Sequence, residues 1–469
     1  MISGLKPYAE MRESGLTWLG DIPAHWDVVR AKTVLHAIDF RSQQGAEELL
    51  TVSSERGVVP RSTANVTMFQ ASSYVGHKLC WPGDLVINSL WAWGRGLGVS
   101  QHHGIVSTAY GVYRPLASAD LDSSYLNLLV RSQAFQWELQ VRSKGIWISR
   151  LQLTDESFLN APLPIPPMDE QAAIVRYLDH ADRRIRRAIV AKQKLIRLLE
   201  EQKRAIIHRA VTRGLDPDVR LKPSGVEWLG DVPEHWDIYR IKQVTQILRG
   251  KFTHRPRNDP SLYDGPYPFI QTGEVARSGK TITAYRQTLN ERGLEVSKMF
   301  PKGTLVMTIA ANIGEVAILD FEACFPDSVV GFVPRDSVHR DYLYYVFTAM
   351  KQELLREAPV NTQGNLNVDR IGCRGIALPP VEVQQLIVDS IETMAMEVDA
   401  AIERFSREIS LLREFRIKLT ADVVTGKLDV RDAAASLPQM IEQDDGEFDT
   451  DEDAEVESLE EVDIEDQAA

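Results

Sequence analysis

The stretch that decides the fold occurs twice. Residues 14–32 read SGLTWLGDIPAHWDVVRAK and residues 224–242 read SGVEWLGDVPEHWDIYRIK, so each matched position recurs 210 residues later. A second pair of motifs, Pro-Pro-x-x-x-Gln ending at Gln171 and at Gln384, is offset by 213 residues, and each copy opens a long helical pattern. Solenoid repeats have periods of roughly 20–50 residues. A period this long therefore predicts one duplicated, domain-sized module.

The repeat divides the chain into segments. A first repeat element (1–26), a variable domain (27–165) and a central long helix (166–215) are followed by a second element (216–236), a second variable domain (237–378) and a second long helix (379–430). An acidic tail (431–469), expected to be disordered, follows them. We predict an α+β fold, with two mixed α/β domains separated by two long helices that pair as an antiparallel coiled coil.

The two long helices are predicted from apolar residues that recur every three or four positions over 169–213 and 382–425. Forty-five helical residues would form a rod of about 67 Å, whose apolar stripe needs another helix to cover it. The first helix has 12 basic and 6 acidic residues, and the second has 5 and 9. Opposite net charges favour pairing of the two helices with each other. The alternative is that each packs on its own globular neighbour.

Shorter elements are expected to repeat as well. The Gly, Pro and Trp residues of the repeat element predict a non-helical segment that packs by its aromatic side chains, Trp18 and Trp26, rather than a ligand site. A turn at Trp81 leads into a buried strand, and the same pattern follows Phe300. Helical spacing predicts helices over 125–139 and 341–355.

Charge and cysteine content indicate the surroundings of the protein. Residues 441–469 contain 15 acidic and no basic side chains, so the rest of the chain carries 53 basic and 51 acidic residues despite an overall charge of −13. Three cysteines without CxxC spacing favour structural thiols in a reducing compartment over disulfides or a zinc cluster. The sequence contains no long apolar run and no signal-peptide pattern, so we expect a cytoplasmic protein.

Motifs for catalysis are absent. The sequence contains no GxxxxGK[ST] phosphate loop, no HExxH zinc motif and no Asn-Pro-Pro-aromatic motif of adenine methyltransferases. The glycines of Gly94-Arg-Gly-Leu-Gly lack the spacing of a dinucleotide fold, and no helical pattern follows them. We therefore expect no catalytic residue, metal site or cofactor in this chain, and interpret it as a binding protein.

Polar and basic loops that contain aromatic residues recur in both variable domains. Arg, Lys, Asn and Gln read base edges in the DNA major groove, whereas Ser, Thr and Lys contact phosphates. The candidate DNA-binding residues in the first domain are Asn88, Trp91, Trp93, Arg95, Lys144, Trp147 and Arg150. Those in the second are Lys251, Arg255, Arg257, Gln271, Thr272, Lys280, Asn361, Thr362, Gln363, Asn365 and Asn367.

These features together resemble the specificity (S) subunits of type I restriction–modification systems. The resemblance covers residues 14–430 and is carried by the doubled SG-x-x-WLG-x-x-P-x-HW element, the two Pro-Pro-x-x-x-Gln helix starts, and residues 361–367, which read NTQGNLN and are similar to a TQ-x-NLN stretch of the family. The first half departs from this pattern, because GIWISR (145–150) stands at the equivalent place.

The resemblance implies a function for each part. Two target recognition domains would read the two parts of a bipartite, asymmetric site in double-stranded DNA. The helices would separate these domains and bind two methyltransferase subunits, and a restriction subunit (a translocase and nuclease) would complete the enzyme. S-adenosylmethionine and adenine flipping would belong to the methyltransferase partner.

Three other interpretations stay open on the sequence. The chain could be a coiled-coil scaffold that binds only proteins, or an enzyme whose site no motif identifies. The acidic tail could be a solvated segment, or a DNA mimic that competes for the basic loops.

Overall fold

A computed structural model describes residues 5–64, 73–145, 151–357 and 366–438. The chain divides into two units, unit 1 (residues 1–191 and 408–469) and unit 2 (residues 192–407). Both boundaries fall inside the long helices α4 (Met168–Arg213) and α10 (Val381–Val424), so each helix contributes one end to each unit. The predicted helices, 169–213 and 382–425, are confirmed to within one residue.

Unit 1 begins with short strands and ends in helices. Its strands are β1 (Met11–Glu13), β2 (Asp21–Pro23), β3 (Asp27–Arg30), β4 (Leu35–Ala37), β5 (Leu50–Ser53), β6 (Gly57–Pro60), β7 (Lys78–Cys80), β8 (Leu85–Asn88), β9 (Leu97–Val99), β10 (Gly104–Val106), β11 (Tyr110–Pro115) and β12 (Pro162–Ile165). Its helices are η1 (Ala31–Thr33), η2 (Arg61–Thr63), η3 (Ala92–Gly94), α1 (Ser123–Val130), α2 (Gln133–Arg142), α3 (Asp155–Leu159) and α11 (Arg431–Ala435), with the ends of α4 and α10.

Unit 2 repeats much of this order. Its strands are β13 (Leu221–Pro223), β14 (Asp231–Pro233), β15 (Asp237–Arg240), β16 (Thr245–Arg249), β17 (Tyr263–Phe269), β18 (Thr281–Ile282), β19 (Gln287–Leu289), β20 (Met299–Phe300), β21 (Leu305–Thr308), β22 (Val316–Leu319), β23 (Ala323–Cys324), β24 (Val329–Pro334) and β25 (Gly375–Leu378). Its helices are α5 (Ile241–Val244), η5 (Pro260–Leu262), α6 (Thr272–Arg277), α7 (Glu291–Glu295), α8 (Arg340–Glu357) and α9 (Val368–Gly372), with the ends of α4 and α10.

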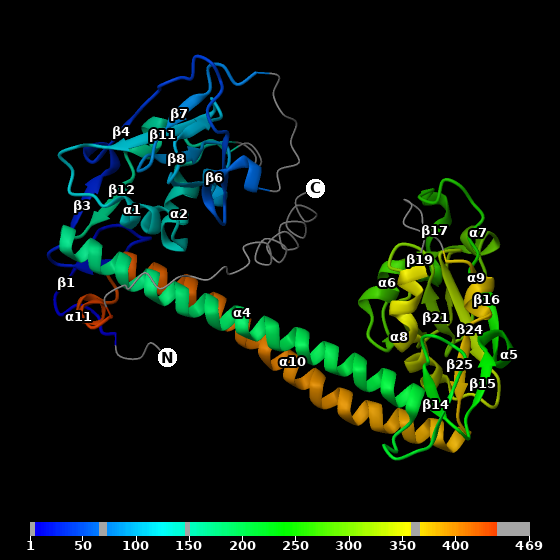
Figure 1. The fold of residues 1–469 in the computed structure, drawn as a ribbon. Helices are drawn as coiled ribbons and strands as arrows, with labels where there is room; N and C mark the ends of the chain where they lie inside the picture. The colour runs from blue at the N-terminus through cyan, green and yellow to red at the C-terminus, as the bar shows by residue number, and fades with distance from the viewer. Residues whose placement is uncertain (1–4, 65–72, 146–150, 358–365, 439–469) are drawn as a thin grey trace. The chain divides into compact units, whose positions relative to one another are not determined.

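The central sheets of the two units share one topology. Unit 1 has the strand order β4-β11-β8-β9, and unit 2 has β16-β24-β21-β22 with β18 added at one edge (Figure 1). The hairpins formed by the repeat elements also match in register, because Met11 pairs with Pro23 and Leu221 pairs with Pro233. The predicted duplication is thus confirmed at the level of strand pairing, and the fold is α+β.

Both faces of each central sheet are covered. In β8, Leu85 and Ile87 pack with helices α1 and α2, whereas Val86 packs on the opposite face with strands β5, β6, β7 and β10. Both faces of strand β21 in unit 2 are covered in the same way: Leu305 packs on the helix side and Val306 packs on the opposite face. A strand covered on both faces reads as a continuous apolar run. This explains the buried strands predicted after Trp81 and Phe300.

One predicted helix is two helices. The segment 125–139 was expected to be continuous, but α1 ends at Val130 and α2 begins at Gln133. The Ser132 hydroxyl accepts a hydrogen bond from Phe135 N at 3.2 Å and so caps α2, which starts a new helix inside the apolar pattern. The equivalent helix α8 has no such break.

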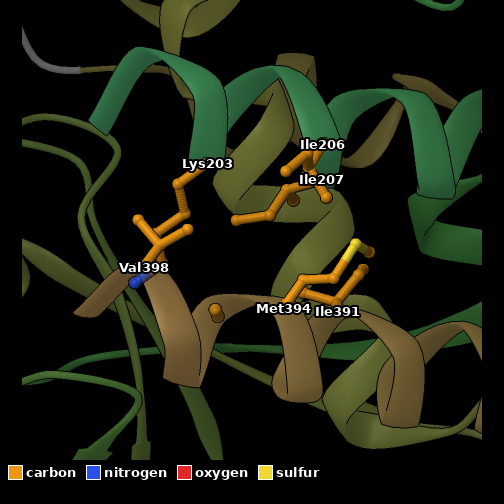
Figure 2. A pocket seen from close by; sticks show the side chains of 7 residues that line it. Lys203, Ile206, Ile207, Ile391, Met394 and Val398 are labelled. Carbon is orange, nitrogen blue, oxygen red and sulfur yellow. The ribbon is translucent and has the colours of Figure 1, made fainter. Parts of the chain in front are cut away.

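The two long helices run antiparallel. In unit 2, Lys192 of α4 lies over the ring of Phe405 of α10, whereas Lys203, further along α4, pairs with Asp399, earlier in α10. Apolar side chains meet between them: Ile206 and Ile207 from α4, and Ile391, Met394 and Val398 from α10 (Figure 2). In unit 1, the end of α10 joins the start of α4 in one apolar core. The predicted antiparallel pairing is confirmed.

Each repeat element packs on the end of the long helix that the other repeat supplies. In unit 1, Trp26 is fully buried, and a Cβ added at Gly426, which follows α10, would lie 3.1 Å from its ring. In unit 2, a Cβ added at Gly214, which follows α4, would likewise lie 3.1 Å from the ring of Trp236. Both glycines have a φ of +75°, the left-handed conformation that ends many helices. Trp18 is partly buried and packs against the same core as Trp26, so the prediction that Trp18 and Trp26 pack in a core is confirmed.

The Pro-Pro-x-x-x-Gln motifs anchor the helix starts. Gln171 is fully buried; its Nε2 donates to the carbonyls of Asp120 and Pro166 at 2.9 Å, and its Oε1 accepts from Asp122 N at 2.8 Å. Gln384 makes the same three bonds in unit 2, to Ser337 O (3.1 Å), Pro379 O (2.8 Å) and His339 N (2.7 Å). The motif thus fixes each long helix to the loop that precedes α1 or α8.

The start of the acidic tail is ordered. Residues 431–469 were expected to be disordered, but Arg431–Ala435 form helix α11, whose Ala434 is buried in the core of unit 1. Alanines and Val430 supply enough apolar surface for this turn to pack, and the strongly acidic composition begins only at residue 442. Residues 439–469 lie outside the described part of the chain.

Candidate nucleic-acid interface

The loop that follows β8 displays aromatic side chains. The rings of Trp91 and Trp93 lie 5.1 Å apart, and Trp91 is 47% exposed. Asn88 Oδ1 accepts from Leu90 N at 3.2 Å and so shapes the start of the loop. Arg95 adopts a φ of +65° directly after η3. The predicted residues Asn88, Trp91, Trp93 and Arg95 therefore share one compact loop with exposed aromatic surface.

A second predicted segment lies beside this loop in unit 1. Lys144 and Gln152 exchange two backbone hydrogen bonds of 3.0 Å, and Lys144 is exposed. The amide of Leu153 then donates to Ser89 O at 2.9 Å, which joins this segment to the loop after β8. Trp147 and Arg150, also predicted, lie outside the described residues.

Unit 2 has the same junction. The amide of Leu366 donates to Ile309 O at 2.9 Å, which joins the end of the NTQGNLN stretch to the loop after β21. The predicted residues Asn361, Thr362, Gln363 and Asn365 lie outside the described residues. Asn367 is described, and its side chain accepts from Asp369 N at 2.8 Å, which caps helix α9. This cap orients the segment that leads out of the stretch.

The loop after β21 (residues 309–315) was missed by sequence reasoning. It exposes Ala311 and Asn312, and Ala311 has a φ of +57°. The signal that identifies it is positional, because it follows the strand Leu305–Thr308 as the tryptophan loop follows Leu85–Asn88. Its polar content is too low for composition to single it out. The duplication was the better guide.

The basic segment 249–257 lies near the same region of unit 2. Arg249 pairs with Asp369, at the start of α9, at 3.7 Å. Arg255 and Arg257 both pair with Asp327, and Lys251 is exposed. The salt bridge at Asp369 brings the start of this segment close to Asn367, the last residue of the NTQGNLN stretch.

Two further predicted residues of unit 2 have internal partners. Gln271 Nε2 donates to the side chain of Gln287, and Gln271 N donates to Glu274 at 3.0 Å at the start of α6, where Thr272 is the first residue. Lys280 pairs with Asp341 of α8 and with Glu392 of α10.

The pairs at Lys280 affect its charge. Partial burial lowers its pKa, but the bonds to its two carboxylate partners outweigh burial and raise the pKa above its ordinary value. The charge of Lys280 is therefore kept and is neutralised within unit 2.

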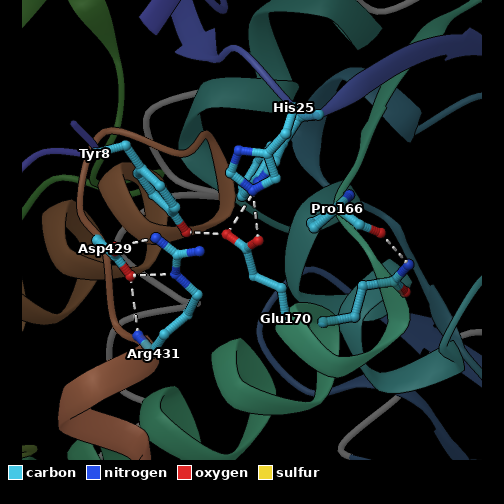
Figure 3. A network of polar contacts seen from close by, with 8 residues as sticks. Tyr8, His25, Pro166, Glu170, Asp429 and Arg431 are labelled. Atoms are coloured by element: carbon cyan, nitrogen blue, oxygen red, sulfur yellow. Dashed lines mark hydrogen bonds and ion pairs between the residues drawn. The ribbon is translucent and has the colours of Figure 1, made fainter. Parts of the chain in front are cut away.

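A buried polar network in unit 1 was also missed by sequence reasoning. The Glu170 carboxylate accepts from the Tyr8 hydroxyl and from Trp26 Nε1 (3.0 Å), and it pairs with His25 Nε2 (2.8 Å) (Figure 3). Burial, and then the bond to Glu170, raise the pKa of Tyr8 above its ordinary range. Arg431 completes the network, because its guanidinium lies 5.1 Å from the Tyr8 ring centre.

This network is specific to the first repeat. The position equivalent to Glu170 in the second repeat is Val383, so the duplicated fold forms without the carboxylate. In the described part of the chain, no three His, Cys, Asp or Glu side chains are placed to hold a metal ion. No described helix is both long and apolar enough to cross a membrane.

Comparisons with known proteins agree in both sequence and fold. Residues 233–404 match the family described as "Type I restriction modification DNA specificity domain". The MjaIX specificity subunit of Methanocaldococcus jannaschii is 26% identical over 196 residues, which are 41% of this chain and 44% of that subunit. The MjaVIII specificity subunit of the same organism is 22% identical over 306 residues, which are 62% of this chain and 68% of that subunit.

A solved chain of a type I R-M system has a similar fold. It matches with a TM-score of 0.66 at 20% identity and covers 87% of this chain and 99% of its own length. The sequence match to the MjaIX specificity subunit covers less than half of that protein. The fold match, in contrast, covers nearly all of the solved chain.

Proposed function

We propose that this chain, a relative of the specificity subunits of type I restriction enzymes, is the non-catalytic subunit that selects the DNA sequence in a type I restriction–modification complex. Its two units would each read one part of a bipartite target in double-stranded DNA. Because the exposed side chains of the two units differ, the two parts of the target would differ as well. The alternative is a scaffold that binds only proteins.

One observation carries this proposal: the same junction holds different side chains in the two units. The bonds Leu153 N to Ser89 O and Leu366 N to Ile309 O have the same length, 2.9 Å, and join equivalent segments. The loop at the first junction exposes Trp91, whereas that at the second exposes Asn312. A constant framework with variable loops suits two readers of different base sequences, because base edges are read by exposed side chains on a fixed support.

Basic side chains add the chemistry for DNA backbone contact. Lys144 in unit 1 and Lys251 in unit 2 are exposed near these junctions. Lysine ammonium groups contact phosphates without regard to sequence and make binding sensitive to salt. The expected division is therefore phosphate contact by the lysines and base contact by the loop residues.

The long helices offer surface for protein partners. Large apolar side chains are exposed on both: Leu195 (44%) and Leu198 (51%) on α4, and Met396 (69%) and Leu411 (58%) on α10. Leu195 and Leu198 are three positions apart and so lie side by side on α4, and contiguous exposed apolar surface marks interaction sites. We propose that two methyltransferase subunits dock on the helices and that restriction subunits join them. S-adenosylmethionine would bind to the methyltransferase, which would flip the target adenine.

The test is a map of adenine methylation across the host genome, with and without the gene. The expected result is the loss of one asymmetric motif made of two short blocks around an unread gap. Trp91→Ala in unit 1 and Asn312→Ala in unit 2 form a matched pair, and each should relax or abolish only one block. Loss of no motif, together with purification of the chain free of any methyltransferase, would favour the scaffold.

The length of the unread gap in the DNA target tests whether the long helices set the spacing between the two units. Seven residues inserted at facing positions of α4 and α10 add about 10.5 Å and nearly two full turns, which keeps the same faces in contact. DNA rises about 3.4 Å per base pair. The unread gap should therefore lengthen by roughly three base pairs while both blocks stay unchanged. An unchanged gap would refute this role of the helices.

A further inference from the structure

The first half of α4 carries a basic strip, which we define as Arg176, His180, Arg183, Arg184 and Arg187. These residues follow one another at intervals of four, three, one and three positions, which places them on one helix face. None of the five is buried, and Arg184 and Arg187 are exposed. The strip therefore presents positive charge to solvent along three turns of unit 1.

The local charges confirm a positive surface. Burial, and after it the neighbouring Arg184 and Arg183, lower the pKa of His180 below its ordinary value. Two aspartates lie in the same stretch of helix: Asp179 pairs with Arg183 at 2.6 Å, and Asp182 pairs with Arg186 at 2.7 Å and with Arg416 of α10. Five arginines against two aspartates give residues 176–187 a formal charge of +3 when His180 is neutral.

The fold does not require this strip. The equivalent positions of α10, 213 residues later, are occupied by Asp389, Thr393, Met396, Glu397 and Ala400. Both helices keep their apolar stripes and their anchoring glutamines, yet only α4 is basic on this face. The positive charge is thus specific to the first repeat.

The described chain ends on this strip. After α11, the Arg176 guanidinium donates to Leu437 O at 2.6 Å and to Pro438 O at 3.3 Å. Arg176 is the first residue of the strip, so the next residues begin at one end of it. The segment that follows, 441–469, holds 15 acidic residues and no basic ones.

We propose that the acidic segment 442–469 docks on the basic strip of α4 and covers it in the same molecule. From Arg176 to Arg187 the helix rises about 17 Å. Extended chain spans at most about 3.6 Å per residue, so the first acidic residues beyond Pro438 can reach every arginine of the strip. The short tether keeps the segment at a high effective concentration, so weak individual contacts suffice for docking.

Docking would shield the strip from other polyanions. A segment with 15 carboxylates competes with nucleic acid phosphates for the same arginines. The proposal does not depend on the proposed DNA-reading function, because it concerns α4 and not the loops of the two units. If the docking proposal fails, the proposed DNA-reading function is unaffected, and the reverse also holds.

The test uses the full-length protein with one fluorescent label on the segment. Cys373 is the exposed cysteine, and Cys80 and Cys324 are buried. A Cys373→Ser, Thr450→Cys background therefore directs the label to the segment. Label anisotropy, followed as sodium chloride is raised, measures the docked fraction. We expect slow rotation at low salt and fast rotation at high salt, because docking is electrostatic.

Two charge reversals on the same helix distinguish the strip from general attraction. Arg184→Glu should lower the docking equilibrium constant about five- to tenfold, since it removes one attraction and adds one repulsion. Arg204→Glu is the matched control, because Arg204 is exposed on α4 outside the strip, and it should change docking less than twofold. Circular dichroism would verify that both variants are folded.

Several results would overturn the proposal. They are a label that rotates freely at low salt, a docked fraction equally sensitive to both reversals, and docking that increases with protein concentration. The last result would assign the segment to a second copy of the chain. Displacement of the label by short duplex DNA, lost in Arg184→Glu, would support the shielding role.

Discussion

Replacing either anchoring glutamine by leucine should loosen one unit and spare the other. Leucine keeps most of the volume of the side chain but can neither donate to the two carbonyls nor accept from the amide that Gln171 and Gln384 satisfy. Each lost hydrogen bond costs about 0.5–1.5 kcal/mol of stability. Three such bonds predict a loss of about 2–4 kcal/mol in the free energy of unfolding for each variant.

Hydrogen exchange followed by mass spectrometry measures the two units separately. A loss of about 2–4 kcal/mol corresponds to roughly 30- to 900-fold faster exchange of amides that exchange by opening of the unit. Gln171→Leu should accelerate exchange around Asp122 and in α1, and Gln384→Leu should do so around His339 and in α8. Because the two bond sets match in geometry, the two effects should be similar in size.

The control is the neighbouring Gln385, which is exposed and bonds only to Asp389 on the same helix. Gln385→Leu should change exchange by less than about threefold, as is usual for surface substitutions. The reasoning would be refuted if Gln384→Leu behaved like Gln385→Leu, because the buried amide would then not hold the start of α10.

Other predictions concern stability. Gly426→Ala should lower the melting temperature more than Gly214→Ala, since both force alanine into a φ of +75° but only the first places a Cβ 2.3 Å from a proline side chain. Burial raises the pKa of Tyr342, so its stabilising contribution is present below pH ~10 and is lost as pH rises further, at about 1.4 kcal/mol per pH unit. Between pH 10 and 11, the Tyr342→Phe variant should therefore lose less unfolding free energy than the unsubstituted protein, as measured by urea titrations. An identical pH dependence in the two proteins would contradict this. A double-mutant cycle on Lys203 and Asp399 should give ~0.2–1 kcal/mol at low salt and almost nothing at 1 M, because Asp399 is exposed and Lys203 is only partly buried.

Sequence periodicity predicted the parts of the fold that depend on local pattern. Both long helices were placed to within a residue, because their apolar spacing continues over more than 40 positions. The duplication followed from identical residues, and the strand registers of the two repeat elements confirm it. The opposite net charges of the two long helices indicated that they pair with each other.

Features that depend on distant partners could not be predicted. The break before α2 arises from a single capping hydroxyl at Ser132, which the apolar pattern conceals. Lys280 was chosen for its charge, but the partners that neutralise it, Asp341 and Glu392, lie 61 and 112 residues away. Glu170 begins an ordinary helix in the sequence, and only the tertiary fold brings Tyr8 to it.

The candidate interface was predicted in part. Tryptophans and arginines identified the loop after β8 by composition, whereas the loop after β21 is recognised only by its place in the fold. Six of the eighteen candidate residues lie outside the described chain, and the DNA contacts of the others stay predictions.

Because each long helix contributes one end to each unit, the two units become complete at different times during protein synthesis. Unit 2 is continuous from residue 192 to 407, so all its residues can leave the ribosome together. Unit 1 is not, because its core requires Leu419, Val423 and Val430. At a synthesis rate of 5–20 residues per second, residues 1–191 of unit 1 wait roughly 10–45 seconds until these core residues have been made. A nonsense mutation shortly after residue 407 should therefore leave the later-made unit intact and send the earlier one to proteolysis.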